Sequence, residues 1–198
     1  MCVICIKPKG TTIDIEDLKL MFEANSHGAG FAVILGKKLY YKKGLMTIEK
    51  LIEEIEEFNN PKYNLVVHCR LASVGGINPE LTHPFPITDK KEELLSLEGY
   101  SKAVLFHNGT LYFNRSNDLS DTANLTVKLA ELKLSPEKLV KVLSLLHGQK
   151  FVLMTPKKIY QIGEFHKHKG LYVSNLSWKW EFKFRFYFNR KNFWTYDF

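Results

Sequence analysis

Short apolar runs separated by polar turns are the feature that most restricts the folds open to this chain. Runs rich in β-branched and aromatic residues that end at turn-forming residues predict strands at 2–7, 29–35, 39–41, 65–69, 103–106, 151–154, 159–162 and 171–173. Helix-start signals and helical spacing of apolar residues predict helices at 14–24, 47–58, 120–132 and 135–147. We expect a long polar loop over 72–99. This order of elements predicts a sheet protein of the α/β or α+β class.

Length and composition favour one ordinary globular domain. The chain has 198 residues, and domains commonly have about 100 to 200. Hydrophobic residues at 45% and charged residues at 25% exclude a disordered chain, a collagen and a coiled coil. No apolar run approaches the roughly 18 residues of a membrane span, and no signal-peptide pattern opens the sequence. We therefore expect a cytoplasmic protein with no membrane partner.

The C-terminal stretch has its own pattern. From Lys179 onward, aromatic residues alternate with mostly charged ones, which is typical of a half-buried strand. We expect a domain over 1–178 and a strand or tail over 179–198 that packs on this domain or at an interface. A homo-oligomer contact and a basic, aromatic nucleic-acid surface are the alternatives for this stretch.

The net charge of +7 does not by itself predict a nucleic-acid-binding protein. The excess comes from 24 lysines and only 4 arginines. Arginine is the residue that reads phosphates and guanines bidentately, so a lysine-rich surface indicates solubility first. Nucleic acid is thus a partner class that the sequence does not favour.

Three cysteines are too few for a disulfide framework, and we expect free thiols. Cys2 and Cys5 have the spacing of a metal or redox motif, but residues three apart in a strand point to opposite faces. Cys5 and Cys69 are expected to be buried as small hydrophobic residues. His166 and His168, flanked by lysines, fit a solvated loop better than a metal site. We expect no metal and no other cofactor.

Polar residues suited to binding or catalysis follow two of the predicted strands. Arg70 follows 65–69, and an arginine fork binds a carboxylate bidentately. Asn108 and Gly109 follow 103–106, where an amide side chain and a backbone N–H can form an oxyanion hole. A simple hairpin turn between Val104 and Tyr112 is the alternative for Asn-Gly. Asp121 opens a predicted helix, where an acidic residue also serves as a cap.

Cys2 directly follows the initiator methionine. Removal of Met1 would leave Cys2 with a free α-amine, whose ordinary pKa of about 7.7 to 8.0 lets it take the proton of the thiol. One residue would then supply both nucleophile and base. A cysteine at this position can also arise by chance, so its position alone is weak support.

In order along the chain, these segments resemble the glutaminase domain of class II glutamine amidotransferases, which are N-terminal nucleophile hydrolases. The resemblance covers about residues 1–135. Its segments are Met1-Cys2-Val3-Ile4, residues 25–32, His68-Cys69-Arg70-Leu71-Ala72-Ser73, Thr82-His83-Pro84-Phe85, His107-Asn108-Gly109 and Ser120-Asp121-Thr122. It implies an α+β fold, a four-layer αββα sandwich with mainly antiparallel sheets.

The resemblance also implies roles for individual residues. Cys2 would attack the side-chain amide of glutamine, and Asn108 with the Gly109 N–H would stabilise the oxyanion. Arg70 would bind the α-carboxylate of the substrate and Asp121 its α-ammonium group. The resemblance further implies that three more residues of the matched segments belong to the substrate site: Ser73, His83 and His107. As side chains, His27, His68, His83 and His107 are nevertheless expected to be hydrogen-bonded structural residues if the Cys2 amine is the base.

Two departures from the family leave alternatives open. Leu71 stands where many members have tryptophan, which puts the substrate specificity in doubt. The chain is also too short to include the synthase domain that uses ammonia in multidomain members, so a partner protein would supply the acceptor site. The alternatives are a related amidohydrolase acting on another amide and a catalytically silent binding or assembly module.

Overall fold

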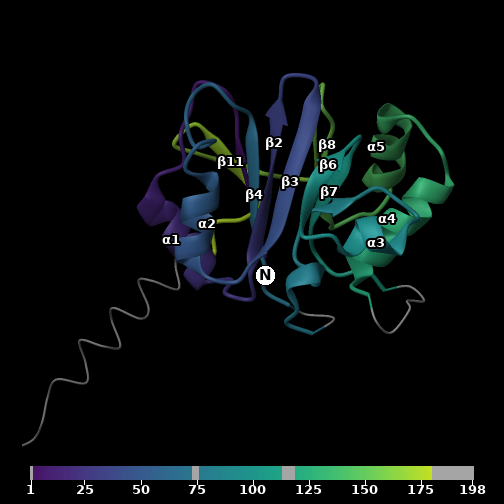
Figure 1. Cartoon of the computed structure of the whole chain (residues 1–198), viewed down its shortest axis with the longest axis horizontal. Helices are drawn as coiled ribbons and strands as arrows, with labels where there is room; N and C mark the ends of the chain where they lie inside the picture. Colours follow the sequence, from purple (N-terminus) through teal and green to yellow (C-terminus); the bar gives the residue numbers. More distant parts are fainter. Residues whose placement is uncertain (1, 73–75, 113–118, 180–198) are drawn as a thin grey trace, which may run out of the picture.

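Two antiparallel sheets packed against each other form the middle of the molecule, with helices on both outer sides (Figure 1). The computed structural model describes residues 2–72, 76–112 and 119–179. Ser73 and residues 180–198 of the predicted C-terminal strand therefore lie outside the described residues. The α+β class expected from the resemblance is confirmed.

The larger sheet runs in the order β10-β11-β1-β4-β2-β3-β6, and its neighbours are antiparallel. Its strands are β1 (Val3–Lys7), β2 (Ala29–Leu35), β3 (Lys38–Leu45), β4 (Leu65–Cys69), β6 (Glu98–Ser101), β10 (His166–His168) and β11 (Leu171–Val173). The first strand thus lies inside the sheet, between β11 and β4, and anchors the start of the described chain in the core.

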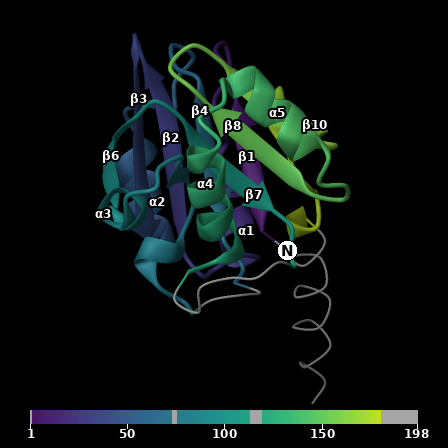
Figure 2. The same cartoon turned by 90° about the vertical axis from the view of Figure 1, so that its right-hand side faces the viewer.

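The smaller sheet runs in the order β5-β7-β8-β9 and is also antiparallel. Its strands are β5 (Phe85–Pro86), β7 (Val104–Asn108), β8 (Lys150–Met154) and β9 (Ile159–Ile162). The helices are α1 (Ile15–Glu23), α2 (Ile48–Ile55), α3 (Lys91–Leu95), α4 (Asp121–Glu131) and α5 (Pro136–Ser144), with a 3-10 turn, η1 (Pro79–Leu81). Figure 2 shows α4 and α5 over β7 and β8.

Alternation of side chains along the strands creates the layers. On β1, Cys5 faces outward to α1 and α2, whereas Ile4 and Ile6 face inward to the second sheet. On β7, Phe106 faces inward and Leu105 faces α4 and α5. Three apolar clusters therefore separate four layers in the order helices, sheet, sheet, helices. This is the αββα arrangement that the resemblance implies.

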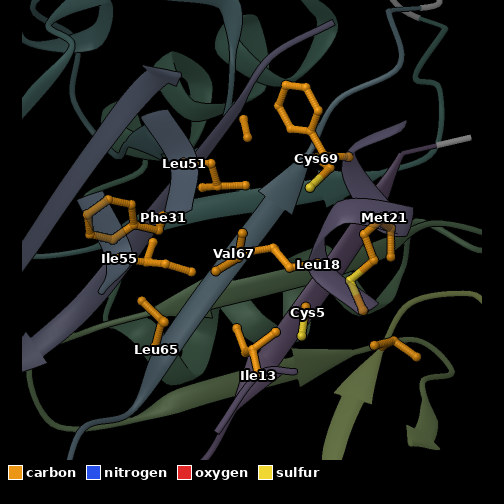
Figure 3. Close-up of a cluster of buried hydrophobic side chains, with 14 of the residues drawn as sticks. Cys5, Ile13, Leu18, Met21, Phe31, Leu51, Ile55, Leu65, Val67 and Cys69 are labelled. Atoms are coloured by element: carbon orange, nitrogen blue, oxygen red, sulfur yellow. The ribbon is translucent and has the colours of Figure 1, made fainter. Parts of the chain in front are cut away.

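The outer cluster under α1 and α2 contains two of the three cysteines (Figure 3). Cys5 and Cys69 pack there with Leu18 and Met21, and both are 1% exposed. Burial raises the pKa of both thiols, that of Cys5 to about 12. The prediction that these two cysteines serve as small hydrophobic residues is confirmed, and neither shares the environment of Cys2.

Most predicted elements occur where the pattern places them, because each has a local signal. Thr47 and Ser120 are N-caps whose side chains accept hydrogen bonds from the backbone of the first helical turn. Helix α2 ends at Ile55, three residues before the predicted end at Phe58. Phe58 still packs on the outer cluster, with its ring centroid 5.7 Å from that of Phe31.

The prediction of a long polar loop over 72–99 is wrong. Within its described part the chain forms η1, β5, α3 and the start of β6. These elements have two to five residues each, too short to produce a periodic pattern in the sequence. Contacts with the rest of the fold stabilise them instead. Lys43 on β3 donates hydrogen bonds of 2.8 Å to the carbonyl oxygens of Glu80 and Leu94.

One further prediction and one alternative do not match the local geometry. His166–His168 is not a loop but the edge strand β10, held by β11 and by a 2.8 Å contact from His168 Nε2 to Asp17. Asn108 and Gly109 do not form the turn of a hairpin from Val104 to Tyr112. Asn108 is the last residue of β7, whose neighbours are β5 and β8. Among the described residues, no helix is long and apolar enough to cross a membrane.

Candidate active site

The ends of three strands bring the predicted site residues together. Cys2 precedes β1 and Arg70 follows β4, and these strands pair antiparallel with Val3 opposite Cys69. Cys2 and Arg70 therefore leave the sheet side by side. Side chains two apart in a strand share a face, and Ile4 faces the second sheet. Cys2 consequently points toward the space between the sheets, where β7 ends at Asn108.

The Cys2 side chain is held by the backbone beyond β4. Its Sγ accepts a hydrogen bond from the Leu71 N–H at 3.3 Å and lies 3.4 Å from the Leu71 carbonyl oxygen. The Cys2 carbonyl oxygen accepts a hydrogen bond of 2.7 Å from Asn175 Nδ2. Burial raises the pKa of the Cys2 thiol, and the Leu71 N–H opposes this effect. The resting group at neutral pH is thus a thiol, which needs a base before it can act as a nucleophile.

Arg70 is fixed through both its backbone and its side chain. Its N–H donates to Gly28 at 2.8 Å, and its carbonyl oxygen accepts from His27 at 2.9 Å. The guanidinium donates a 3.0 Å hydrogen bond to the carbonyl oxygen of Gly76. Arg70 is 3% exposed, and a guanidinium carries five N–H donors. A guanidinium can bind a carboxylate bidentately, so Arg70 is a cation that a carboxylate ligand could contact here.

Asn108 is oriented by a residue distant in sequence. Its Nδ2 donates a 2.9 Å hydrogen bond to Ser174 Oγ, which also accepts from the Ile4 N–H at 2.9 Å. An amide nitrogen carries two hydrogens, so one remains for a ligand. Gly109 has a φ of +154°, and a Cβ there would overlap the Gln149 side chain. A residue without a Cβ is therefore needed here for the backbone to lie this close to the Gln149 side chain.

Asp121 begins α4 and already accepts hydrogen bonds from the protein. One carboxylate oxygen accepts from the Leu111 N–H at 2.9 Å, and the other accepts from the Thr122 N–H at 2.8 Å. Asp121 is 8% exposed. A carboxylate has about four acceptor positions, which leaves room for an ammonium group. Asp121 thus lies in the first turn of the helix, after the N-cap Ser120, and also lines the site with a carboxylate.

Three buried imidazoles lie at or next to the site, and two of them, His83 and His107, line the cavity of Cys2. His107 contacts Thr122 Oγ1 through Nδ1 and Gln149 Oε1 through Nε2, both at 2.9 Å. His68 donates through Nε2 to the carbonyl oxygen of His107 at 3.1 Å. Burial lowers the pKa of His107, that of His68 to about 3, and that of His83 well below its ordinary value. All three rings are therefore neutral at pH 7.

His83 differs from the expectation of a hydrogen-bonded residue. Both of its ring nitrogens are buried without a hydrogen-bond partner among the described residues, and its ring lies 4.1 Å from that of His68. His83 is 5% exposed and lines the same small cavity as Cys2. It is therefore an imidazole with unused hydrogen-bonding capacity that lines the cavity of Cys2.

Two adjoining cavities meet at Cys2. The smaller, of about 20 Å³, has room for about one water molecule. It brings together six of the predicted site residues: Cys2, Arg70, His83, His107, Gly109 and Asp121. The larger has a volume of about 410 Å³ and is bounded by Cys2, Asn108 and Gly109 among others. Seven of the eight predicted site residues thus line one or both cavities, and Ser73 lies outside the described residues.

Three residues near the site were not found by sequence reasoning. Ser174 and Asn175 follow β11 and contact Asn108 and Cys2, and Gln149 contacts His107. Polar residues directly after a strand were the signal that identified Arg70, and Ser174 and Asn175 carry the same signal. Within the described ranges, no group of three or more His, Cys, Asp or Glu side chains could hold a metal ion.

Comparison with known proteins gives a structural likeness only. No protein-family model matches the chain, and no curated protein matches it in sequence. A solved structure of glutamine phosphoribosylpyrophosphate amidotransferase from B. subtilis, complexed with ADP and GMP, is similar with a TM-score of 0.55 and 20% identity. The match covers 87% of this chain and 41% of that chain.

A second similar structure is described as the allosteric regulatory enzyme of purine biosynthesis, with a TM-score of 0.46, 17% identity and the same coverage of both chains. The chain thus spans about two fifths of the length of each of these structures. A structural likeness at 20% sequence identity shows the fold alone. The described chain therefore has an αββα fold similar to that of the matched part of the B. subtilis amidotransferase structure.

Proposed function

We propose that this chain hydrolyses the side-chain amide of glutamine through a thioester on Cys2 and releases ammonia for transfer to an acceptor. The observation that carries the proposal is the shared cavity lined by Cys2, Arg70, Gly109 and Asp121, with Asn108 on the adjoining one. A zwitterionic amino acid needs one cation and one anion, and Arg70 and Asp121 supply them beside a thiol.

The chemistry begins with removal of Met1, which frees the α-amine of Cys2. This amine takes the thiol proton while sulfur attacks the amide carbon, and the resulting oxyanion accepts hydrogen bonds from Asn108 and the Gly109 N–H. The C–N bond then breaks, and ammonia leaves with the proton held by the amine. Water attacks the thioester, its proton passes to the amine, and the thiol is regenerated as glutamate departs.

Glutamine enters this site only if the site opens. The space between Arg70 and Asp121 has a volume of about 20 Å³, whereas an amino acid needs many times the volume of one water molecule. The Arg70 guanidinium also donates a hydrogen bond to the Gly76 carbonyl oxygen. Glutamine would enter when its α-carboxylate replaces the Gly76 carbonyl oxygen as the acceptor of the Arg70 guanidinium, because both oxygen groups accept from the same N–H donors.

An acceptor for ammonia is also part of the proposal. The similar B. subtilis structure is named for glutamine and phosphoribosylpyrophosphate, and this chain spans 41% of that length. We infer that the ammonia acceptor binds outside the described residues, on a partner protein or another domain. A synthase that activates an acceptor for ammonia is the class of partner that fits this chemistry.

The direct test is glutamate production from L-glutamine by protein whose intact mass shows the loss of Met1. Cys2→Ala should abolish turnover, whereas Cys69→Ala serves as the matched control because Cys69 is a buried core thiol that lines neither cavity. Turnover that persists in Cys2→Ala at the wild-type rate would overturn the proposal.

The α-amine has its own test. A chain extended by several residues before Met1 keeps Cys2 in a peptide bond, so its nitrogen cannot act as a base. We expect this extended protein to fold with an unchanged melting temperature and to lose at least about 100-fold in kcat, the usual contribution of a positioned general base. Equal activity of the extended and processed proteins would exclude the amine as the base.

A further inference from the structure

The larger cavity beside Cys2 is much bigger than the release of ammonia requires. Its volume of about 410 Å³ lies within the range of about 300 to 1,000 Å³ that small-molecule sites occupy. Ammonia is about the size of water, which takes up roughly 30 Å³ in the liquid. The cavity could therefore hold a group more than ten times larger than the leaving group of glutamine itself.

The larger cavity lies on the side where the leaving group of the substrate would be. Cys2 and Gly109 line both cavities, so the reacting carbon would lie where the two meet. Arg70 and Asp121 line only the smaller cavity, and the proposed function places the α-carboxylate and α-ammonium there. The amide nitrogen of a bound substrate would then face the larger cavity, on the side of Thr110 and Tyr112.

We propose that the preferred substrates are γ-glutamyl amides whose amide nitrogen carries an organic substituent, with the amine part bound in the larger cavity. This inference rests on the proposed function and names the substrate class of the same site. The bond that breaks is still the C–N bond of the side-chain amide. The Cys2 amine gives its proton to the departing nitrogen, so a neutral primary amine leaves in place of ammonia, and water completes the hydrolysis to glutamate.

The lining of the cavity specifies the chemistry of that amine. Its described lining contains no Lys, Arg, His, Asp or Glu side chain. Leu71, Ala72 and Tyr112 offer apolar surface, and Thr110 and Gln149 are its uncharged polar members. A charged substituent would lose hydration there without an ion-pair partner among the described lining residues. An uncharged alkyl or arylalkyl substituent fits this lining better.

The test compares three substrates whose leaving groups are ammonia or simple alkyl amines: L-glutamine, γ-glutamylmethylamide and γ-glutamylbenzylamide. With processed wild-type protein, kcat/KM should rise along this series. The benzylamide should exceed glutamine by at least about tenfold, the selectivity that apolar pocket contacts of this size give.

Variants of residues that line the larger cavity test whether this cavity causes the preference. Thr110→Trp fills the cavity and should lower the ratio of kcat/KM for benzylamide to that for glutamine at least about tenfold, whereas the matched Thr110→Ser should keep the ratio. Tyr112 is 91% exposed, so Tyr112→Ala tests the same wall with little effect on folding, and it should also lower the ratio.

Three outcomes would overturn the inference, and they separate it from the proposed function. If glutamine is hydrolysed but both substituted amides react at least about tenfold more slowly, the substrate class is wrong and the proposed function stands. If benzylamide is preferred but neither Thr110→Trp nor Tyr112→Ala changes the ratio, the cavity is not the binding site. If processed protein cleaves none of the three, the proposed function and the inference both fail.

Discussion

Ser174 connects Asn108 with the strand that carries Cys2. Its hydroxyl oxygen accepts from Asn108 Nδ2 and from the Ile4 N–H, each at 2.9 Å, so one side chain sets the Asn108 amide against the strand that carries Cys2. Asn175 extends this link to the carbonyl oxygen of Cys2. Ser174 is fully buried, and it acts on the reaction only through Asn108. It is therefore a positioning residue.

Replacing Ser174 tests this arrangement. Ser174→Ala leaves two buried donors without an acceptor, and we expect a loss of about 1 to 3 kcal/mol in the free energy of unfolding. An oxyanion contact acts mainly in the transition state, so kcat should fall about tenfold with little change in KM. Urea unfolding and steady-state kinetics measure both effects. The exposed helix residue Ser144, changed to alanine, should alter neither, and an unchanged kcat in Ser174→Ala would contradict the positioning role.

The buried imidazoles predict sensitivity to acid. Burial lowers the folded-state pKa of His68 to about 3, from 6.5, and that of His83 well below 6.5. Below pH 6.5 the unfolded chain binds protons that the folded chain does not, so stability falls as the pH decreases. The His68 ring alone should cost about 2 kcal/mol by pH 5, and the His83 ring should add to this loss. Urea unfolding between pH 7 and pH 5 measures this loss.

A His83 variant separates this effect from general acid sensitivity. His83→Phe removes one of these protonation sites, so the loss of stability between pH 7 and pH 5 should be smaller than in the wild type. The exposed His147 gives the control, because His147→Phe should leave the pH dependence as it is in the wild type. An identical pH dependence in His83→Phe and wild type would show that His83 does not contribute.

How much of the site is predictable differs from residue to residue. Arg70 and Asn108 stand directly after strong strand patterns, and Cys2 stands after the initiator methionine, so local sequence identifies all three. The hydrogen bond between Asn108 and Ser174 joins residues 66 positions apart. No local pattern encodes that distance, because it depends on how β11 and β7 pack in two different sheets.

Among the elements, the segment from η1 to β6 depends most on tertiary contacts. Strands such as β2 and β4 begin and end where their apolar runs do, since pattern and burial agree. By contrast, η1 and α3 are stabilised by Lys43, whose ammonium group contacts two carbonyl oxygens and lies 4.3 Å from the centre of the Phe85 ring. A lysine in a strand gave no sequence signal of this role.

Because Lys43 is buried, we also expect the free energy of unfolding to depend on pH in the alkaline range. Burial lowers its folded-state pKa to about 7, from 10.5. Between these values the unfolded chain binds a proton that the folded chain has released, so the free energy of unfolding rises with pH. The rise should approach about 1.4 kcal/mol per pH unit between pH 8 and pH 9.5.

Comparison of Lys43→Met with the wild type isolates this contribution. The variant lacks the titrating group, so its stability should lack this rise, and urea unfolding at pH 8 and pH 9.5 measures the difference. Lys50→Met, at an exposed position on α2, should retain the wild-type rise. A wild-type slope in Lys43→Met would mean that other groups cause the dependence.

For the whole molecule, the four-layer architecture explains why the site forms where it does. The two sheets pack through an apolar cluster that includes Ile4 and Phe106, and the strands carrying Cys2, Arg70 and Asn108 reach the same edge of that stack. The expected division into a domain over 1–178 and a terminal strand over 179–198 stays a prediction, because 180–198 lies outside the described residues.

The central claim is that Cys2 is a nucleophile held beside a site for the amino-acid end of a glutamine derivative. Its most direct test is covalent labelling by a glutamine analogue that carries a diazoketone in place of the side-chain amide, followed by peptide mass spectrometry. On protein lacking Met1, we predict one label on Cys2, absent in Cys2→Ala, slowed in Arg70→Ala and blocked by excess L-glutamine. Unlabelled Cys2 in correctly processed, folded protein would contradict the account.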